Sequence, residues 1–515
     1  SRSSASALRR YPSASNGAAA GFVLENLGHA EIQNSNVSSS AGSAMVKSAG
    51  GDAAGFVWKN GESSQYSASI SGSGVSGIGV KSPASEASGF ACYQYGSSRM
   101  SDNTVQSASV DGNVLAAGMI LENSSSAENS VSGCRVLSGT VASAAGSAYG
   151  FAGDNSGSIY DSLVSGTTVT AQISAGGFFG SNYGAISSST SSASVAAENT
   201  ANGKAAGFGL MNGGTLNSCS ASSTAKGALS SGFVFENGSS GTVSSCTVSG
   251  AAVLVNNSTG SAAGFVYTNN GSVGGSKLSS SSINAAITAG FVYQNERDIS
   301  DCGVIESSVI GTATAAGFAY RNDAGTISRC AVLNGTVSGA YQASGFAGQN
   351  SGTINTCYVS GAVITSAQGN ACGFANEAGT GIESCYSDCS ISGSNACGFC
   401  ATGTVSNCFA LGSIAGTKTA YGFAQQADCT SCYSAAAASD SQTLKFEESG
   451  NTVSCYQFRT VEYSYYYGGY GVTYDDPEND VYFDSLIDDG LFSGSTWAVT
   501  YNSPYLILRG SFYTV

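Results

Sequence analysis

The stretch Gly345–Gly361, which reads GFAGQNSGTINTCYVSG, decides the fold. It carries three markers in order: a Gly-Phe pair, an Asn five residues after the glycine, and a Cys three residues after an apolar side chain. The same order recurs along most of the 515 residues at intervals of roughly 24 to 34. That interval suits one coil of a β-solenoid, since three short strands and three turns use about that many residues.

The Gly-Phe pair is the most regular marker. We expect its rings, one per coil, to stack in a dry core, each burying an area worth about 2 to 3 kcal/mol. Phe265, Phe291, Phe318 and Phe346 are members of this predicted ladder. The fifteen repeat glycines are Gly21, Gly55, Gly89, Gly118 (followed by Met119), Gly150, Gly177, Gly207, Gly232, Gly264, Gly290, Gly317, Gly345, Gly373, Gly398 and Gly422.

The Asn marker predicts a second ladder. Asn tolerates the left-handed backbone of a tight corner, and its amide can hydrogen-bond to its counterparts in neighbouring coils. Gln94 replaces it once, and the marker is lost after Gly373. The predicted members include Asn269, Asn295, Asn322 and Asn350.

Strand alternation predicts which side chains face inward. The residue four after the repeat glycine is often charged, as at Glu25 and Arg321, so that position faces water. Alternation then places the residue three after the glycine inside, together with the Phe and the Asn. The residues placed inside on this basis are Leu24, Trp58, Leu121, Phe235, Tyr267, Tyr293 and Tyr320.

The third marker predicts a cysteine ladder. Stacked strands lie about 4.8 Å apart, slightly beyond the usual Cβ separation of a disulfide, which favours buried thiols packed as small hydrophobes. Serines occupy this position in several earlier coils. The predicted ladder residues are Cys302, Cys330, Cys357, Cys385 and Cys408, with Cys432 at the matching position of the next coil.

Other cysteines leave two chemistries open. Cys372 and Cys397 precede consecutive Gly-Phe pairs, with Cys389 and Cys400 nearby, and this cluster is a candidate for disulfides. The spacing of Cys397 to Cys400, and of Cys429 to Cys432, is also compatible with zinc. We expect neither a metal nor another cofactor, because the repeat already explains Cys432.

Composition and charge exclude several classes of function. A formal net charge of −15 with 18 basic residues favours neither nucleic acid nor an anionic membrane as partner. No run of eighteen apolar residues predicts a membrane span, and no signal peptide is visible. His29 is the single histidine, so a catalytic triad is not expected and His29 is assigned to the surface.

The last part of the chain has a different composition, with acidic residues among tyrosines at Asp475, Asp476, Glu478, Asp480, Asp484, Asp488 and Asp489. We interpret this as a solvated cap, since solenoid ends must cover an open sheet edge. Calcium binding and sugar cleavage by paired carboxylates are the alternatives. The expected domains are an N-terminal tail at 1–17, a repeat array at 18–440 and a cap or assembly module at 441–515.

The segment Gly345–Gly361 resembles the GLUG repeat of bacterial cell-surface and adhesin-like proteins, and the match runs from about Ala18 to Tyr433. Trp497 and the run Ser503-Pro504-Tyr505-Leu506 resemble the ending of such arrays. Here the second family glycine is mostly Leu, Tyr or Phe. The resemblance implies a parallel β-helix, export and surface display, and it supplies no catalytic residues.

Together these patterns predict an all-β, right-handed parallel β-helix of about fifteen coils with a Tyr- and Asp-rich C-terminal capping segment. We expect an extracellular or cell-surface structural or adhesive protein that is not an enzyme. Because no N-terminal capping domain is visible, self-association head to tail into a filament is the favoured form. The alternatives are a monomeric adhesin that binds a glycan or a host surface, and a polysaccharide-active enzyme.

Overall fold

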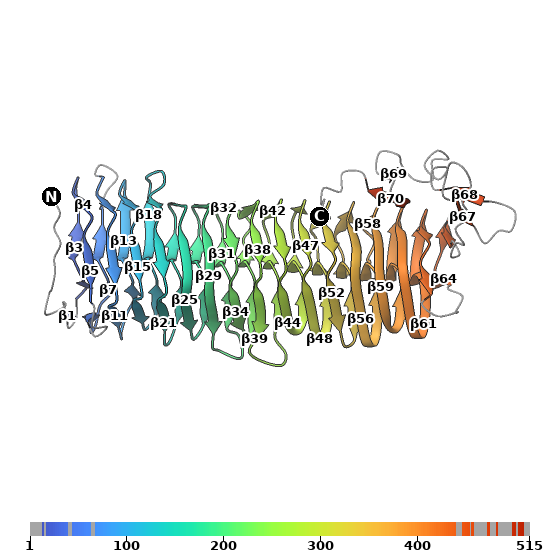
Figure 1. Ribbon diagram of the computed structural model, residues 1–515, viewed down its shortest axis with the longest axis horizontal. Helices are drawn as coiled ribbons and strands as arrows, with labels where there is room; N and C mark the ends of the chain where they lie inside the picture. The colour runs from blue at the N-terminus through green and yellow to red at the C-terminus, as the bar shows by residue number, and fades with distance from the viewer. Residues whose placement is uncertain are drawn as a thin grey trace. The chain divides into compact units, whose positions relative to one another are not determined.

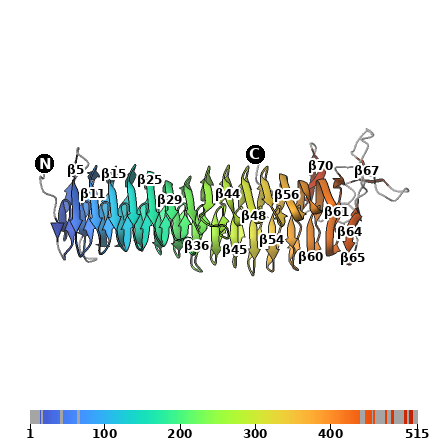
Figure 2. The ribbon, with the colours of Figure 1, turned by 90° about the horizontal axis from the view of Figure 1, so that it is seen from below.

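The computed structural model describes residues 13–14, 17–39, 44–62, 67–438, 445–453, 455–457, 471–473, 480–482, 497–500 and 503–508. The chain divides into two compact units, Ser1–Ser272 and Val273–Val515, which we describe separately. In each unit, short parallel strands stack turn upon turn (Figures 1 and 2). No described residue lies in a helix, so none lies in a helix that could cross a membrane. The predicted parallel β-solenoid is confirmed.

In the first unit, each strand pairs in register with its counterpart one turn later. One turn consists of β7 (Ala53–Ala54), β8 (Val57–Asn60), β9 (Ser69–Ser71), β10 (Gly74–Ser76) and β11 (Gly79–Ser82). The next consists of β12 (Ala87–Ser88), β13 (Ala91–Gly96), β14 (Arg99–Ser101), β15 (Thr104–Gln106) and β16 (Ser109–Gly112). β17 (Leu115–Ala117) and β18 (Ile120–Ser125) continue the stack.

The second unit repeats this arrangement, and its strands fuse toward the C-terminal side. One turn consists of β49 (Ala319–Asn322), β50 (Thr326–Ser328), β51 (Ala331–Leu333), β52 (Thr336–Gly339) and β53 (Gln342–Ser344). β54 (Ala347–Asn350) and β55 (Thr353–Asn355) follow. The long strands are β56 (Tyr358–Cys372), β59 (Tyr386–Cys397), β60 (Cys400–Ser406) and β61 (Phe409–Thr430).

Sharp corners explain why many turns contain five strand segments and not the three expected. Asp301, which precedes Cys302, has a φ of 56°, and Thr356, which precedes Cys357, has a φ of 53°. A positive φ points the chain in a new direction between two strands. The Asn marker has no such φ at any described position, so the prediction of a left-handed Asn corner is wrong. Asn322, for example, is the last residue of strand β49.

The repeat glycine is required by the next turn of the chain. A Cβ added at Gly317 would come closer to the carbonyl oxygen of Gly345, in the next turn, than real Cβ atoms come to backbone atoms. Immediately after this contact, the N–H groups of Phe318 and Ala319 both donate to the carbonyl of Phe346, each at 2.9 Å. Strand alternation is therefore interrupted at every such bend, because two successive residues turn toward the core.

This interruption corrects the predicted facing of the residue three after the glycine. Phe318 and Ala319 are both fully buried, whereas Tyr320 is half-buried on the outer side and Arg321 is exposed. Trp58, Tyr267 and Tyr293 are likewise half-buried, and Leu24 is exposed. Leu121 and Phe235 are buried, but Leu121 lies against the outside of the bend, as described below.

The described residues form about 13 turns, fewer than the fifteen expected. Fifteen repeat glycines delimit only fourteen intervals, and the boundary between the two units falls within the interval from Gly264 to Gly290. Two antiparallel pairs complete the described residues. They are β67 (Gly471–Thr473) with β68 (Asp480–Tyr482), and β69 (Trp497–Thr500) with β70 (Ser503–Leu508).

Candidate functional site

The repeat phenylalanines form stacked ladders inside each unit. In the second unit Phe318 lies between Phe291, at a ring-centroid distance of 4.8 Å, and Phe346, at 4.7 Å. In the first unit Phe233 stacks on Phe265 at 4.8 Å. All of these rings are fully buried, so they stabilise the core and offer no surface to a ligand.

The Asn residues form a parallel chain of buried amides. Asn322 accepts a hydrogen bond from the Asn295 amide at 2.8 Å and donates to Asn350 at 2.7 Å. In the first unit Asn237 donates to Asn269 at 2.9 Å, and Gln94 keeps the chain intact by donating to Asn123 at 3.3 Å. These amides make their hydrogen bonds to one another and to backbone carbonyls, so they are not available to a ligand.

The cysteine ladder is also internal. The backbone N–H of Cys330 donates to the sulfur of Cys357 at 3.4 Å, and the Cys330 thiol donates to the carbonyl of Ser328 at 3.2 Å. Cys385 and Cys408 continue the ladder, and Cys302 precedes Cys330. Burial raises the pKa of the Cys302, Cys330 and Cys408 thiols well above its ordinary value. A buried thiol with a raised pKa is a poor nucleophile, so these three cysteines act in packing, and Cys385 between them is equally buried.

The candidate disulfides are not formed. All sixteen cysteines lie in the part of the chain that the structure describes, and none of them is in a disulfide. Cys372 and Cys397 occupy the same position in neighbouring turns, with side chains that run parallel instead of converging. Cys389 lies opposite Ala362 and Gly412, and Cys400 lies opposite Ala375 and Ala424, so register separates each of them from another cysteine.

The remaining predicted candidates carry no chemistry in the described residues. No cluster of His, Cys, Asp or Glu among the described residues could hold a metal ion. This finding covers the cysteines with zinc-like spacing, Cys397, Cys400, Cys429 and Cys432. His29 is exposed and lies 3.3 Å from the Ser67 hydroxyl. Of the C-terminal acidic residues, only Asp480 is described, as backbone in β68, and the others lie outside the described residues, as does most of the predicted tail at 1–17.

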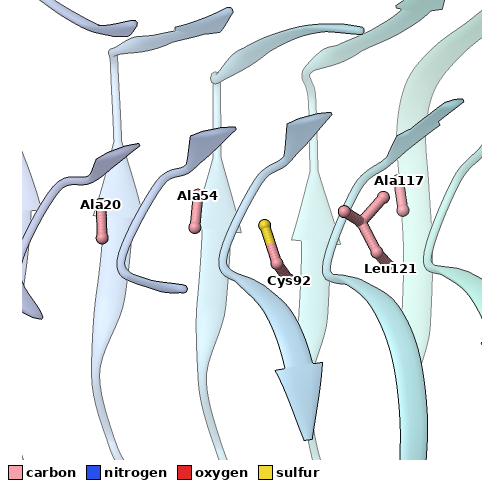
Figure 3. Packing of buried hydrophobic residues seen from close by; sticks show 5 residues of the cluster. All are labelled: Ala20, Ala54, Cys92, Ala117 and Leu121. Carbon is pink, nitrogen blue, oxygen red and sulfur yellow. The ribbon is translucent and has the colours of Figure 1, made fainter. Parts of the chain in front are cut away.

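A different feature gathers on the outer side of the Gly-Phe bend in the first unit. Ala20, Ala54 and Ala117 each stand directly before a repeat glycine. They form a buried cluster with Cys92 and Leu121, each of which is the third residue after a repeat glycine (Figure 3). Trp58 and Tyr93 cover this buried cluster and stay half-exposed. We call Trp58, Tyr93 and Tyr95 the aromatic surface.

The three rings of the aromatic surface are held in a defined geometry. Trp58 and Tyr93 meet edge to face with their centroids 5.6 Å apart, and Tyr93 and Tyr95 are nearly parallel at 6.0 Å. Tyr93 and Tyr95 lie on the same strand, β13, which is hydrogen-bonded to β8 and β18 on its two sides. Rigid strands therefore position the rings before any ligand arrives.

Carboxylates surround the aromatic surface. The Tyr93 hydroxyl donates to Asp52 at 3.0 Å, and the Ser85 hydroxyl donates to the same carboxylate at 2.7 Å. The Tyr95 hydroxyl donates to Glu122 at 3.2 Å. Burial, followed by the Glu122 carboxylate, raises the pKa of Tyr95 to about 12, so its hydroxyl stays a donor at neutral pH.

Glu86 lies among these charges. Burial raises the pKa of its carboxyl above the ordinary value of 4.5, and the negative charges of Asp52, Asp154 and Glu122 raise it further. Asp52 and Glu86 both stand three residues before a repeat glycine, and Glu122 and Asp154 both stand four residues after one. The stacking of the turns thus concentrates four carboxyl groups that are far apart in the sequence.

A shallow cavity of about 590 Å³ lies elsewhere on the first unit, lined in part by Met45, Ile78 and Lys81. The Lys81 ammonium already pairs with the Asp111 carboxylate at 2.5 Å, so the charges of this cavity neutralise each other. The aromatic surface is consequently the better candidate.

No family model matches this chain, and neither does a curated protein or a solved structure. The resemblance to GLUG-repeat proteins therefore stays a prediction. The sequence reasoning missed the aromatic surface because it placed Trp58 inside. Alignment of the repeats on Gly55 and Gly89 could have found it, since that alignment brings Asp52 and Glu86 to the same position and Trp58 close to Tyr93.

Proposed function

We propose that this chain is an extracellular or cell-surface adhesive protein that binds a glycan and does not transform it. The observation that carries the proposal is the aromatic surface: three half-exposed rings on rigid strands, bordered by hydrogen-bonding carboxylates. Aromatic rings stack on the apolar faces of sugars, and carboxylates accept hydrogen bonds from hydroxyl groups. The buried ladders supply a scaffold that holds such a surface in place.

The chemistry of the described residues supports binding in preference to catalysis. The cysteines of the ladder are buried, burial raises the pKa of the Cys330 thiol, and the Asn amides bond to one another. The carboxylates of Asp52 and Glu122 are fixed by hydroxyl donors from Tyr and Ser side chains. A polysaccharide-active enzyme remains the alternative that the experiment must test.

The test uses the full chain and a panel of surface polysaccharides immobilised on beads, with retention and release of soluble fragments both measured. The proposal expects retention of the protein on at least one polysaccharide, with no fragments released. Release of fragments that depends on Asp52 or Glu122 would show catalysis and overturn it. Absence of retention on the whole panel would also overturn it. Protease treatment of intact source cells should remove the protein if it is displayed outside them.

Head-to-tail assembly into a filament is a second proposal. It is suggested by the way the turns stack, since the Phe22 ring lies 4.7 Å from the Phe56 ring and the strands of the two turns pair in register. A second copy could extend the stack through the same kind of contact. Electron microscopy of the purified full chain should show filaments that shorten when Phe22 is replaced by Glu. Dispersed particles at all concentrations would contradict assembly.

A further inference from the structure

The aromatic surface of the first unit carries an excess of negative charge that its own residues do not neutralise. The side chains that hydrogen-bond to Asp52 and Glu122 are Trp, Tyr and Ser, all of them uncharged. Among the described residues, none of Asp52, Glu86, Glu122 or Asp154 makes an ion pair. The site is therefore electrostatically incomplete.

The basic residue on the neighbouring strand does not complete it. Lys59 lies on β8, opposite Tyr93 on β13 and beside Trp58 in sequence, and it forms no ion pair in the described part of the chain. Four carboxyl groups against one lysine leave the surface negative. A positively charged ligand is favoured for this reason, and an anionic glycan is disfavoured.

The rings favour the same kind of ligand. The face of an aromatic ring carries negative charge density and attracts an ammonium group, most strongly for Trp. Trp58, Tyr93 and Tyr95 are all half-exposed. The ring centroids of Trp58 and Tyr93 lie 5.6 Å apart, and those of Tyr93 and Tyr95 lie 6.0 Å apart. A divalent metal is a poorer match, because the described acidic groups do not gather into a metal cluster.

We propose that the aromatic surface binds an oligosaccharide of amino sugars, with sugar rings on Trp58 and Tyr95 and a protonated amino group between Asp52 and Glu86. This inference rests on the proposed function and names its ligand class. A sugar ring uses the flat apolar faces, its hydroxyl groups use the carboxylate oxygens, and the ammonium group supplies the missing positive charge. A polyamine would satisfy the charge and leave the ring faces without a stacking partner.

Binding to the full chain is measured by calorimetry at neutral pH with three probes: a glucosamine oligomer, the N-acetylglucosamine oligomer of the same length, and spermine. The glucosamine oligomer should bind at least about tenfold more tightly than either of the others, and added salt should weaken it. Equal affinity for the N-acetylated oligomer would overturn the role of the charge. Equal affinity for spermine would overturn the role of the sugar ring.

Variants locate the site. Trp58→Ala and Glu86→Gln should each weaken binding of the glucosamine oligomer by about tenfold. Tyr183→Ala, which removes a ring that is 57 % exposed elsewhere on the first unit, should leave it unchanged. Glu86→Gln removes a negative charge that the neighbouring carboxylates repel, so this variant should fold normally. It therefore tests the site even if Trp58→Ala loses binding because it fails to fold. If Glu86→Gln binds as tightly as the unmodified chain, the assignment of this surface fails.

The outcomes separate this inference from the proposed function. Should no amino-sugar oligomer bind while another polysaccharide of the panel retains the protein, the ligand class is wrong and adhesion stands. Should nothing bind at all, both fail.

Discussion

The Tyr93 hydroxyl donates a hydrogen bond to the Asp52 carboxylate at 3.0 Å, although 41 residues separate the two in the chain. The contact joins consecutive turns of the first unit on their outer side, since Asp52 precedes β7 and Tyr93 lies on β13. It ties the ring that borders the proposed ligand site to the carboxylate that would contact the ligand. Similar contacts between turns, repeated in the core, make the scaffold rigid.

The phenylalanine ladder should contribute strongly to stability. Phe318→Ala removes a fully buried ring that stacks on Phe291 and Phe346, so the free energy of unfolding should fall by about 3 to 5 kcal/mol. Urea unfolding followed by circular dichroism measures the change. Tyr341→Ala is the matched control, because Tyr341 is 58 % exposed, and a change within about 0.5 kcal/mol is expected there.

The Asn ladder should not tolerate a negative charge. Asn322→Asp removes the amide that donates to Asn350 and to the carbonyls of Gly325 and Thr353, and it leaves a buried carboxylate facing three acceptors. Unfolding free energy at neutral pH should fall by at least about 3 kcal/mol. Because burial raises the pKa of the new carboxyl, acidification should restore part of the loss. The same change at exposed Asn284 should have little effect, and equal losses at both positions would contradict a buried ladder.

The cysteines should remain as thiols in the native protein. Intact mass measured with and without a reductant should be identical, since none of the sixteen cysteines is in a disulfide. Alkylation of the native chain should be slow at the buried ladder and fastest at Cys455, the least buried cysteine. Full labelling is expected only after unfolding. A bridge between Cys372 and Cys397 in the mass data would contradict the register-based argument.

Glu86 should make stability depend on pH in a definite direction. Burial, and then the charges of Asp52, Asp154 and Glu122, raise the pKa of its carboxyl in the folded state. The folded protein holds this proton more tightly, so the stabilisation is present below pH 4.5 and is lost as pH rises through the folded pKa.

The unmodified chain should therefore lose more stability between pH 4 and pH 7 than Glu86→Gln does, by less than about 1 kcal/mol because Glu86 is half-exposed. Thermal unfolding at several pH values measures the difference. A larger loss in the variant would reverse the assigned sign.

The sharp corner just before the cysteine-ladder position has a positive φ, so it should tolerate some residue types better than others. Ser188 has a φ of 50° and an exposed side chain, so its replacement acts through the backbone. Ser188→Val should destabilise the chain by more than about 1 kcal/mol, whereas Ser188→Gly should be neutral or slightly stabilising. The two variants are compared by urea unfolding, and equal effects would show that the corner is not strained.

Repetition made much of the core readable in advance. Phe318 and Phe346, or Asn322 and Asn350, occupy the same place in successive repeats, and stacking then brings like residues together. Other features were not readable in this way. The sequence pattern did not reveal that Thr356 and not the Asn forms the left-handed corner, nor that Trp58 lies outside.

The amino-acid sequence by itself determined the period, the stacked parallel architecture and the identity of the three ladders, because equal spacing and in-register pairing follow from the repeat alone. Only the tertiary structure decided which residues face outward at the bend and which distant groups meet there. The physical reason is that Phe318 and Ala319 both donate to one carbonyl of the next turn, which interrupts strand alternation. That hydrogen-bond partner lies a full turn away, so no local pattern of residues encodes it.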